Sequence, residues 1–179
     1  ATKELPPLTK EQDRTLTGLI KSKDTPSLIH GDTGTGKTRL YIELARRCLE
    51  TGKSVLVLTP EIGLTPQLAE EFRICLNYPV LILHSNLTGT QRRNLWLQIL
   101  YATGPLVIIG PRSALFAPLE NIGLIVVDEA HDNSYKQDQL PHYHALRVAG
   151  KLAQLHNAQL AFGSATPLVS EYSILKSKQ

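Results

Sequence analysis

The segment at residues 31–38 constrains the fold of this chain more than any other. Its sequence is GDTGTGKT, and it lies between a short apolar run at residues 26–30 and an amphipathic helical pattern at residues 40–48. Three glycines in eight residues let the backbone wrap so that successive amide groups face a single ligand. The sequence therefore predicts a strand, a glycine-rich turn and a helix in direct succession.

Short apolar runs and longer helical patterns alternate along the rest of the chain. Gly52 lies where a glycine commonly ends a helix, and Pro66 lies where a proline commonly begins one. This alternation is typical of a doubly wound α/β fold, a mainly parallel sheet with helices on both faces and ligands at the carboxyl ends of its strands. We expect strands at residues 26–30, 54–59, 80–83, 106–109, 124–127 and 159–162, and five or six helices, after the glycine-rich turn, after Pro66, and over residues 9–23, 91–101 and 143–155.

Length and composition favour one folded domain over residues 1–179, since 42% of the residues are apolar and no repeat or linker interrupts the chain. The net charge of +3 is too small to argue for nucleic acid by itself. No apolar run approaches the ~20 residues of a membrane span, and residues 1–7 lack a secretory signal, so we expect a cytoplasmic protein without membrane contact. Cys48 and Cys75 lie on apolar helix stripes without histidine partners; we interpret both as core and expect no zinc site.

The glycine-rich segment has the full pattern of a Walker A motif in the strand, turn and helix context that the motif requires. Lys37 is expected to contact the β- and γ-phosphates of a nucleotide, and Thr38 to bind the Mg²⁺ that bridges them. The amino end of the following helix adds its positive dipole to the same site. The alternative is a glycine-rich turn that matches by chance. The expected nucleotide-binding residues are Gly31, Thr33, Gly34, Thr35, Gly36, Lys37 and Thr38.

The apolar run at residues 124–127 ends in DEAH, which brings two adjacent carboxylates to the same edge of the predicted sheet. In this Walker B arrangement Asp128 would bind Mg²⁺, directly or through its waters, and Glu129 would orient and deprotonate the attacking water. A solvated turn is the alternative. Together with Lys37, the two carboxylates predict a catalytic site that hydrolyses its nucleotide rather than one that only binds it.

Five features occur in an order that resembles superfamily 2 helicases: Gln12, GDTGTGKT, TPEIGLTPQ, DEAH and GSATP. Residues 60–67, 112–116 and 132–144 resemble more closely the primosomal replication-restart DNA helicases of bacteria. The resemblance extends over nearly the whole chain. It implies a RecA-like P-loop NTPase domain, the first of the two lobes of such a motor.

The resemblance implies an ATP-dependent 3′-to-5′ DNA helicase that unwinds DNA at stalled or repaired replication forks, so that the replisome can be reloaded. It implies ATP and Mg²⁺ as ligands, and single-stranded and forked DNA, other primosome proteins and single-stranded DNA-binding protein as partners. It also implies a longer parent chain with a second RecA-like lobe, without whose arginine finger ATP hydrolysis would be very slow. A double-stranded DNA translocase and a nucleotide-responsive DNA-binding module without turnover are the alternatives.

Gln12 has two interpretations. By its place in the resemblance it reads the adenine edge, for which an amide that both donates and accepts is suited. Thr9 and Gln12 also have the spacing of a capping box, in which Gln12 only caps a helix. The sequence leaves both open.

The resemblance also assigns residues to DNA contact and to the coupling of DNA with ATP hydrolysis. Two loops that follow strands would contact phosphate, and the segment after DEAH would be an aromatic-rich loop that stacks on bases. The GSAT segment would link nucleotide state to DNA grip, with its serine bonded to His131. A metal site at His131, His142 and His144 is an alternative for this region. The assigned residues are Pro60, Glu61, Thr65, Arg112, Ser113, His131, Tyr135, Lys136, Tyr143, Ser164 and Thr166.

Overall fold

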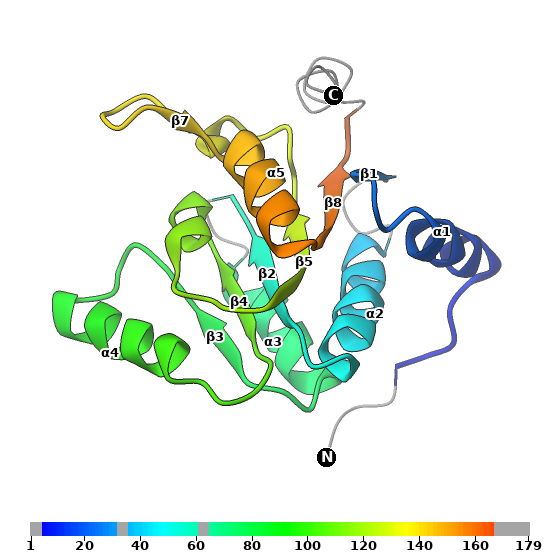
Figure 1. Cartoon of the computed structure of the whole chain (residues 1–179). Coiled ribbons are helices and arrows are strands. Elements are labelled where there is room, and N and C mark those ends of the chain that lie inside the picture. The colour runs from blue at the N-terminus through cyan, green and yellow to red at the C-terminus, as the bar shows by residue number, and fades with distance from the viewer. Residues whose placement is uncertain (1–4, 32–35, 61–64, 167–179) are drawn as a thin grey trace.

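The computed structural model describes residues 5–31, 36–60 and 65–166, and its framework is a sheet of six parallel strands (Figure 1). The strands are short and mostly apolar, because a parallel sheet that is covered on both faces has no solvent side. They are β1 (Ser27–His30), β2 (Ser54–Leu58), β3 (Val80–Ile82), β4 (Val107–Gly110), β5 (Ile122–Val127) and β8 (Gln159–Ser164).

The order of the strands across the sheet differs from their order in the chain. The last strand, β8, lies between β1 and β5, and the full order is β1-β8-β5-β2-β4-β3. Phe162 of β8 is in register with Leu28 of β1 on one side and with Val127 of β5 on the other. The carboxyl ends of these three strands therefore bring distant parts of the sequence side by side.

Helices cover both faces of this sheet (Figure 1). On one face lie α1 (Lys10–Lys21), α2 (Lys37–Glu50) and α3 (Thr65–Cys75). On the other lie α5 (Ala145–His156) and the 3₁₀ helix η1 (Arg112–Phe116). The predicted doubly wound α/β architecture is confirmed, and the RecA-like sheet is parallel throughout.

Successive side chains of a strand divide between the two layers, as the geometry of a strand requires. Val55 and Val57 of β2 belong to the core with α2 and α3, whereas Leu56 and Leu58 belong to the core with α5 and η1. Both cores are thus anchored on the same central strand, which is why residues 55–58 of β2 are all apolar.

Two strands are longer than the sequence pattern predicts. β5 begins at Ile122 rather than at residue 124, because Ile122 still pairs with Ser54. β8 continues to Ser164 rather than ending at residue 162, since Gly163 pairs with Ile29 of the neighbouring strand. A glycine and a serine resemble a turn in the sequence, but here they extend the sheet.

The helix predicted over residues 143–155 begins two residues later. Tyr143 and His144 form β7 (Tyr143–His144), which pairs antiparallel with β6 (Lys136–Gln137). His144 then caps α5, because its ring Nδ1 accepts a hydrogen bond from the Leu146 amide at 3.3 Å. The first helix also ends earlier than predicted, at Lys21.

The predicted capping box at the start of α1 is present. The Thr9 amide donates to Gln12 Oε1 at 3.0 Å, and the Gln12 amide donates to Thr9 Oγ1 at 3.2 Å. An equivalent box joins Thr88 and Gln91 at the start of α4 (Gly89–Leu100). The two capping boxes have the same residues and hydrogen bonds, but only the one at Gln12 lies beside Gly36.

The two cysteines are not equally buried. Cys75 is buried within the core, as predicted, while Cys48 is half-buried at its margin. Burial raises the pKa of the Cys48 thiol to about 11, against an opposing effect of Lys53.

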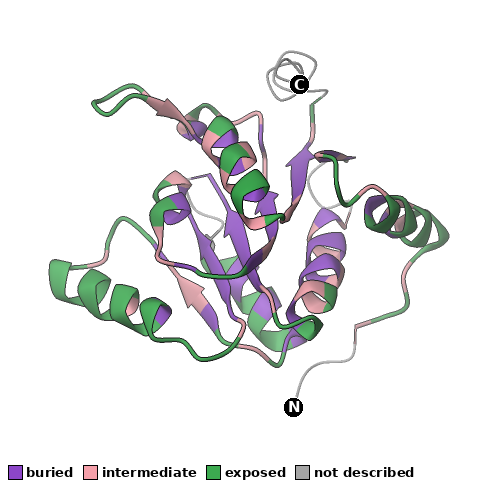
Figure 2. Cartoon of the chain, in the orientation of Figure 1, coloured by how far each residue is buried: buried purple, intermediate pink, exposed green. Residues whose placement is uncertain are grey.

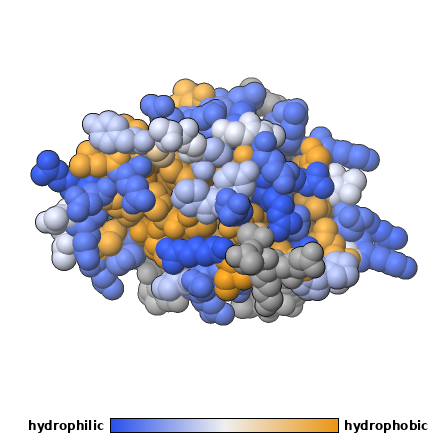
Figure 3. Space-filling view, turned by 90° about the horizontal axis from the view of Figure 1, so that it is seen from below, coloured by the Kyte–Doolittle hydropathy of each residue, from blue (hydrophilic) through white to orange (hydrophobic). Residues whose placement is uncertain are grey.

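α4 is mostly exposed, and among its side chains only Ile99 is fully buried (Figure 2). Trp96, Leu97 and Leu100 on this helix, and Tyr101 at its end, are exposed large apolar residues. Seen from below, the surface carries an apolar area within polar surroundings (Figure 3). No helix in the described part of the chain is both long and apolar enough to cross a membrane.

Candidate functional site

The Walker A and Walker B residues meet at the carboxyl ends of β1, β8 and β5. Gly31 follows β1, Lys37 opens α2, and Asp128 and Glu129 follow β5. The Gly31 amide donates to Ser164 O at 3.1 Å, which ties the first strand to the last one at this edge. Three of the expected nucleotide-binding residues, Thr33, Gly34 and Thr35, lie outside the described residues.

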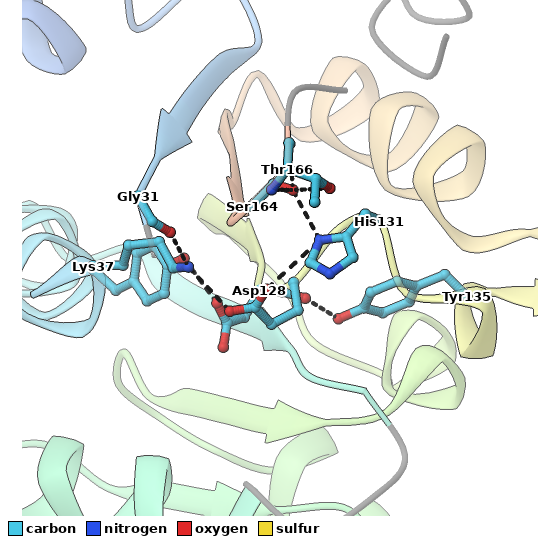
Figure 4. Close-up of polar contacts among 9 residues, drawn as sticks. Gly31, Lys37, Asp128, His131, Tyr135, Ser164 and Thr166 are labelled. Carbon is cyan, nitrogen blue, oxygen red and sulfur yellow. Dashed lines mark hydrogen bonds and ion pairs between the residues drawn. The ribbon is translucent and has the colours of Figure 1, made fainter. Parts of the chain in front are cut away.

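Lys37 is the central cation of this edge (Figure 4). Its Nζ donates to Gly31 O at 2.7 Å and to Glu129 Oε1 at 3.0 Å, and only 8% of the residue is exposed. A buried ammonium group is stable only with such partners. The lysine of the first motif is therefore held against a carboxylate of the second motif.

Asp128 is fixed at three atoms. Its amide donates to Leu58 O at 2.8 Å, its Oδ1 accepts from the Tyr41 hydroxyl at 2.9 Å, and its carbonyl accepts from the Tyr135 hydroxyl at 2.5 Å. Burial raises the pKa of Asp128 and the charge of Glu129 adds to the rise, whereas the Tyr41 hydrogen bond lowers it. Burial and the charge of Asp128 raise the pKa of both tyrosines, so both hydroxyls remain donors.

Glu129 has a backbone conformation that is unusual for its type. Its φ of 44° lies in the left-handed region, which costs a non-glycine residue about 1–3 kcal/mol. Neighbouring backbone bonds hold it there: the Ala130 amide donates to Gly163 O, and the Asp132 amide donates to Glu129 O, both at 2.8 Å. The turn aims the Glu129 carboxylate at Lys37, away from the direction of the preceding strand.

His131, Ser164 and Thr166 form the predicted polar link behind this edge (Figure 4). His131 Nδ1 lies 2.8 Å from Ser164 Oγ, so the hydrogen bond expected between them is present. Ser164 Oγ donates its one proton to Thr166 O at 2.8 Å. Ser164 must then accept from His131, which assigns the ring proton to Nδ1.

Gln12 lies against the glycine-rich turn as well as in its capping box. A β-carbon built on Gly36 would stand 2.4 Å from Gln12 Nε2, and Gly36 has a φ of 89°. Glycine is therefore favoured at position 36 by its left-handed backbone, while the Gln12 amide, at the end of a flexible side chain, lies in the space beside it. Both interpretations of Gln12 are compatible with this placement.

The predicted DNA contacts after β2 and β4 differ in accessibility. Pro60 is buried, so its ring is not exposed in this conformation, and its part in DNA contact stays a prediction. Glu61 lies outside the described residues, and Thr65 is the first residue of α3. Ser113 is exposed.

Arg112 is engaged with its own chain. Its Nη1 donates to Ser134 O and to Lys136 O, each at 2.5 Å. These carbonyls belong to the segment that follows DEAH, where η2 (Asn133–Tyr135) and β6 lie. The guanidinium thus holds that segment to η1, which the sequence did not predict.

The aromatic residues after DEAH are not free to stack on bases in this conformation. Tyr135 is 1% exposed, with its hydroxyl on Asp128 O, so the prediction of a stacking ring is wrong here. Tyr143 is half-buried and packs edge-on against Phe116, with ring centroids 5.3 Å apart. Lys136 is exposed, as a phosphate contact requires.

The donors at this edge fit a magnesium-bound nucleotide. Asp128 offers a carboxylate at a strand end, and Thr38 is the second residue of α2. Within residues 5–31, 36–60 and 65–166, no group of three or more His, Cys, Asp or Glu side chains could hold a metal ion. Mg²⁺ does not require such a cluster of side chains, since phosphate and water commonly supply most of its ligands. The alternative of a metal site at three histidines gains no support.

Two residues at this edge escaped the sequence prediction, Tyr41 and Gly163. Tyr41 lies four residues after Lys37 on a helix, so both point to the same side, which is a signal that spacing alone could have given. Gly163 is the first residue of the GSATP segment, but the sequence gives no sign of its role, because only the structure shows what fills the space beside it.

The sequence matches the DEAD/DEAH box helicase family over residues 9–173. It is 39% identical to replication restart protein PriA of Bacillus subtilis over 171 residues, covering 93% of this chain and 21% of that protein. Identity to replication restart protein PriA of Synechocystis is 47% over 146 residues, covering 81% of this chain and 17% of that protein. The chain thus spans about a fifth of the length of these curated relatives.

Solved structures have the same fold. The Pyrococcus furiosus Hef helicase domain superposes with a TM-score of 0.62 at 24% identity, covering 92% of this chain and 34% of that chain. The family match includes the glycine-rich turn, DEAH and Ser164, the segments that meet at the carboxyl edge of the sheet. This chain belongs to the DEAD/DEAH box helicase family.

Proposed function

We propose that this chain is the first RecA-like lobe of an ATP-dependent 3′-to-5′ DNA helicase that acts in replication restart. The observation that carries the proposal is the contact of Lys37 Nζ with Glu129 Oε1 at 3.0 Å, at the shared edge of β1, β8 and β5. It joins the two motifs that an ATPase of this family requires. Identity of 39% and 47% to proteins named for replication restart supports the biological setting.

The residues of the site divide the chemistry among them. Lys37 would leave Glu129 for the β- and γ-phosphates, and the freed Glu129 carboxylate would then accept a proton from the attacking water. Gly31, Thr33, Gly34, Thr35 and Gly36 would present backbone groups to the phosphates. Thr38 and Asp128 would hold Mg²⁺, which neutralises charge on the phosphates when bound.

The exchange of partners by Lys37 gives this site a built-in order of events. While Lys37 is paired with Glu129, one oxygen of the carboxylate is occupied by the ammonium group. Arrival of the nucleotide would draw the lysine away and leave the carboxylate free. The base is then active only when the phosphates are present.

DNA contact and coupling would come from the other side of β5. Ser113 and Lys136 are exposed there and suit phosphate contact. Arg112 and Tyr135 would act in coupling, because one holds the segment after DEAH and the other bonds to Asp128 O. His131, Ser164 and Thr166 would relay the state of the nucleotide across the same edge.

The wider setting is also a proposal. The parent chain would supply a second RecA-like lobe with an arginine finger. Partners would include single-stranded and forked DNA, primosome proteins and single-stranded DNA-binding protein, in the cytoplasm.

The test is ATP turnover by this chain and by the full-length protein that contains it, each with and without forked DNA at matched salt. We expect DNA-stimulated turnover in the full-length protein and a rate lower by about 10³-fold or more in the isolated chain. DNA-independent turnover at equal rates in both would contradict the proposal and favour another class of P-loop ATPase.

Strand displacement separates a helicase from a double-stranded DNA translocase. Partial duplexes with a single-stranded arm on one side or the other, each with a labelled strand, report both unwinding and polarity. We expect release of the labelled strand only when the loading arm permits 3′-to-5′ movement. Turnover stimulated by duplex DNA without strand release would favour a translocase.

A further inference from the structure

Asp128 is supported by a side chain that the established motifs do not include. Tyr41 lies on α2, one helical turn beyond Lys37, and is 0% exposed. Its hydroxyl donates to Asp128 Oδ1 at 2.9 Å. The helix that begins with the phosphate lysine therefore also holds the carboxylate of the opposite motif.

Among the described residues, the bond is the one side-chain hydrogen bond to a carboxylate that also accepts from the backbone N–H of Glu129. The Asp128 amide and carbonyl are held by Leu58 O and by Tyr135, but neither contact sets the rotation of the side chain. The hydrogen bond of Tyr41 to Oδ1 does so, together with the contact of the Glu129 backbone N–H. A second partner that orients a ligating carboxylate commonly tunes metal affinity.

Gly163 provides the space in which this contact exists. A β-carbon built at this position of β8 would stand 1.6 Å from Tyr41 Oη, 2.9 Å from its Cζ and 3.2 Å from Asp128 Oδ1. No side chain larger than hydrogen fits beside the hydroxyl without displacing it. Residues of one helix and two strands, α2, β5 and β8, thus meet at this hydrogen bond.

We propose that Tyr41 is a positioning residue for magnesium: its hydroxyl orients the Asp128 carboxylate toward the Mg²⁺ of bound ATP, and Gly163 is the glycine that accommodates it. The inference rests on the proposed ATPase function and adds to it a residue that touches neither nucleotide nor metal. It predicts that loss of one oxygen atom weakens the response to Mg²⁺ and leaves the phosphate contacts of Lys37 unaltered.

The test compares Tyr41→Phe with Tyr101→Phe, the same chemical change at a tyrosine that is 74% exposed. Affinity for a fluorescent ADP analogue is measured against Mg²⁺ concentration, with a second series in excess chelator and the melting temperature of each variant. We expect half-maximal Mg²⁺ concentration to rise about 10-fold in Tyr41→Phe, with recovery at high Mg²⁺ and unchanged affinity in chelator. Tyr101→Phe should match the unmodified protein in every series.

The outcomes separate the inference from the function on which it rests. If the unmodified protein binds the analogue in a Mg²⁺-dependent way and Tyr41→Phe has the same Mg²⁺ dependence, only the inference is overturned, even if the melting temperature falls. If the unmodified protein shows no Mg²⁺-dependent binding, the proposed function fails with it.

Gly163→Ala gives a second, independent arm. It should raise the half-maximal Mg²⁺ concentration at least as much as Tyr41→Phe, because the added methyl group displaces the hydroxyl. Combining the two changes should add little to Gly163→Ala alone, since the contact is already lost. Fully additive effects of the two substitutions would overturn the proposal.

Discussion

The two sides of the carboxyl end of β5 differ in the partners of their expected functional side chains. On the nucleotide side, groups of the two motifs already lie together: Lys37 Nζ is 3.0 Å from Glu129 Oε1, and Asp128 Oδ1 accepts from the Tyr41 hydroxyl at 2.9 Å. On the other side the expected DNA residues contact their own chain: Arg112 holds two carbonyls, and Tyr135 is buried. A nucleotide would have to exchange one ion pair, that of Lys37 with Glu129, whereas DNA would meet a surface whose arginine and aromatic residues are occupied.

The largest effect should come from the base itself. Glu129→Gln removes the proton acceptor and keeps the size of the side chain, so we expect kcat of the full-length protein with DNA to fall about 10²- to 10⁴-fold. ATP affinity should be retained or improved, because the neutral amide no longer repels phosphate. The checks are steady-state turnover and nucleotide titration, with exposed Glu120→Gln as the control. Undiminished turnover would remove Glu129 from the mechanism.

Lys37→Ala tests whether the nucleotide side depends on its one buried ammonium group. Hydrogen bonds to charged groups contribute about 1.5–3 kcal/mol, so nucleotide affinity should fall about 10- to 100-fold. The measurement is a titration calorimetry experiment at fixed Mg²⁺, with Lys151→Ala, an exposed lysine of α5, as the control. Retained affinity would show that residues 31–38 do not bind phosphate through this lysine.

Many contacts on the nucleotide side could be predicted from the local sequence, whereas few on the DNA side could. Residues 31–38 and DEAH each follow an apolar run, and parallel strands bring their ends to one edge, so the meeting of Lys37 and Glu129 was predictable. The contact of Arg112 with Ser134 O and Lys136 O joins segments more than twenty residues apart. Nothing in either segment specifies the other, because backbone carbonyls are present at every residue.

The predicted ends of two elements differ from the observed ones for a related physical reason. Gly163 and Ser164 have the composition of a turn, yet they pair with β1 because a parallel neighbour accepts any residue that can hydrogen-bond. Tyr143 and His144 fit the pattern of the following helix, yet they pair with β6. In both places, hydrogen bonding to a strand distant in the sequence outweighed the local preference of the residues.

Arg112→Ala sharpens the comparison on the DNA side. It leaves two backbone carbonyls without their donor, so we expect a loss of about 1–3 kcal/mol, which is about 2–4 °C in melting temperature per kcal/mol for a chain of this size. Ser113→Ala at the adjacent exposed residue should leave the melting temperature unchanged. If Arg112→Ala instead leaves stability intact and lowers the salt dependence of DNA binding, the arginine is a phosphate contact.

The smallest effect separates the two interpretations of Gln12. Gln12→Ala and Gln91→Ala each break one capping box, so both should lower stability by roughly 1 kcal/mol. The control at Gln91 should leave nucleotide preference unchanged. Only if Gln12 reads adenine should Gln12→Ala also reduce the ratio of ATP affinity to GTP affinity; an unchanged ratio would assign Gln12 to the cap alone.

The position of β8 between β1 and β5 has a consequence for folding during synthesis. A ribosome releases the chain from its amino end, so both Walker segments emerge before the strand that must lie between them. Until residues 159–164 are synthesised, β1 lacks the strand with which it pairs, and β5, which is paired with β2, lacks its second neighbour. We therefore expect the two Walker segments to reach their final spacing only after residues 159–164 have been synthesised.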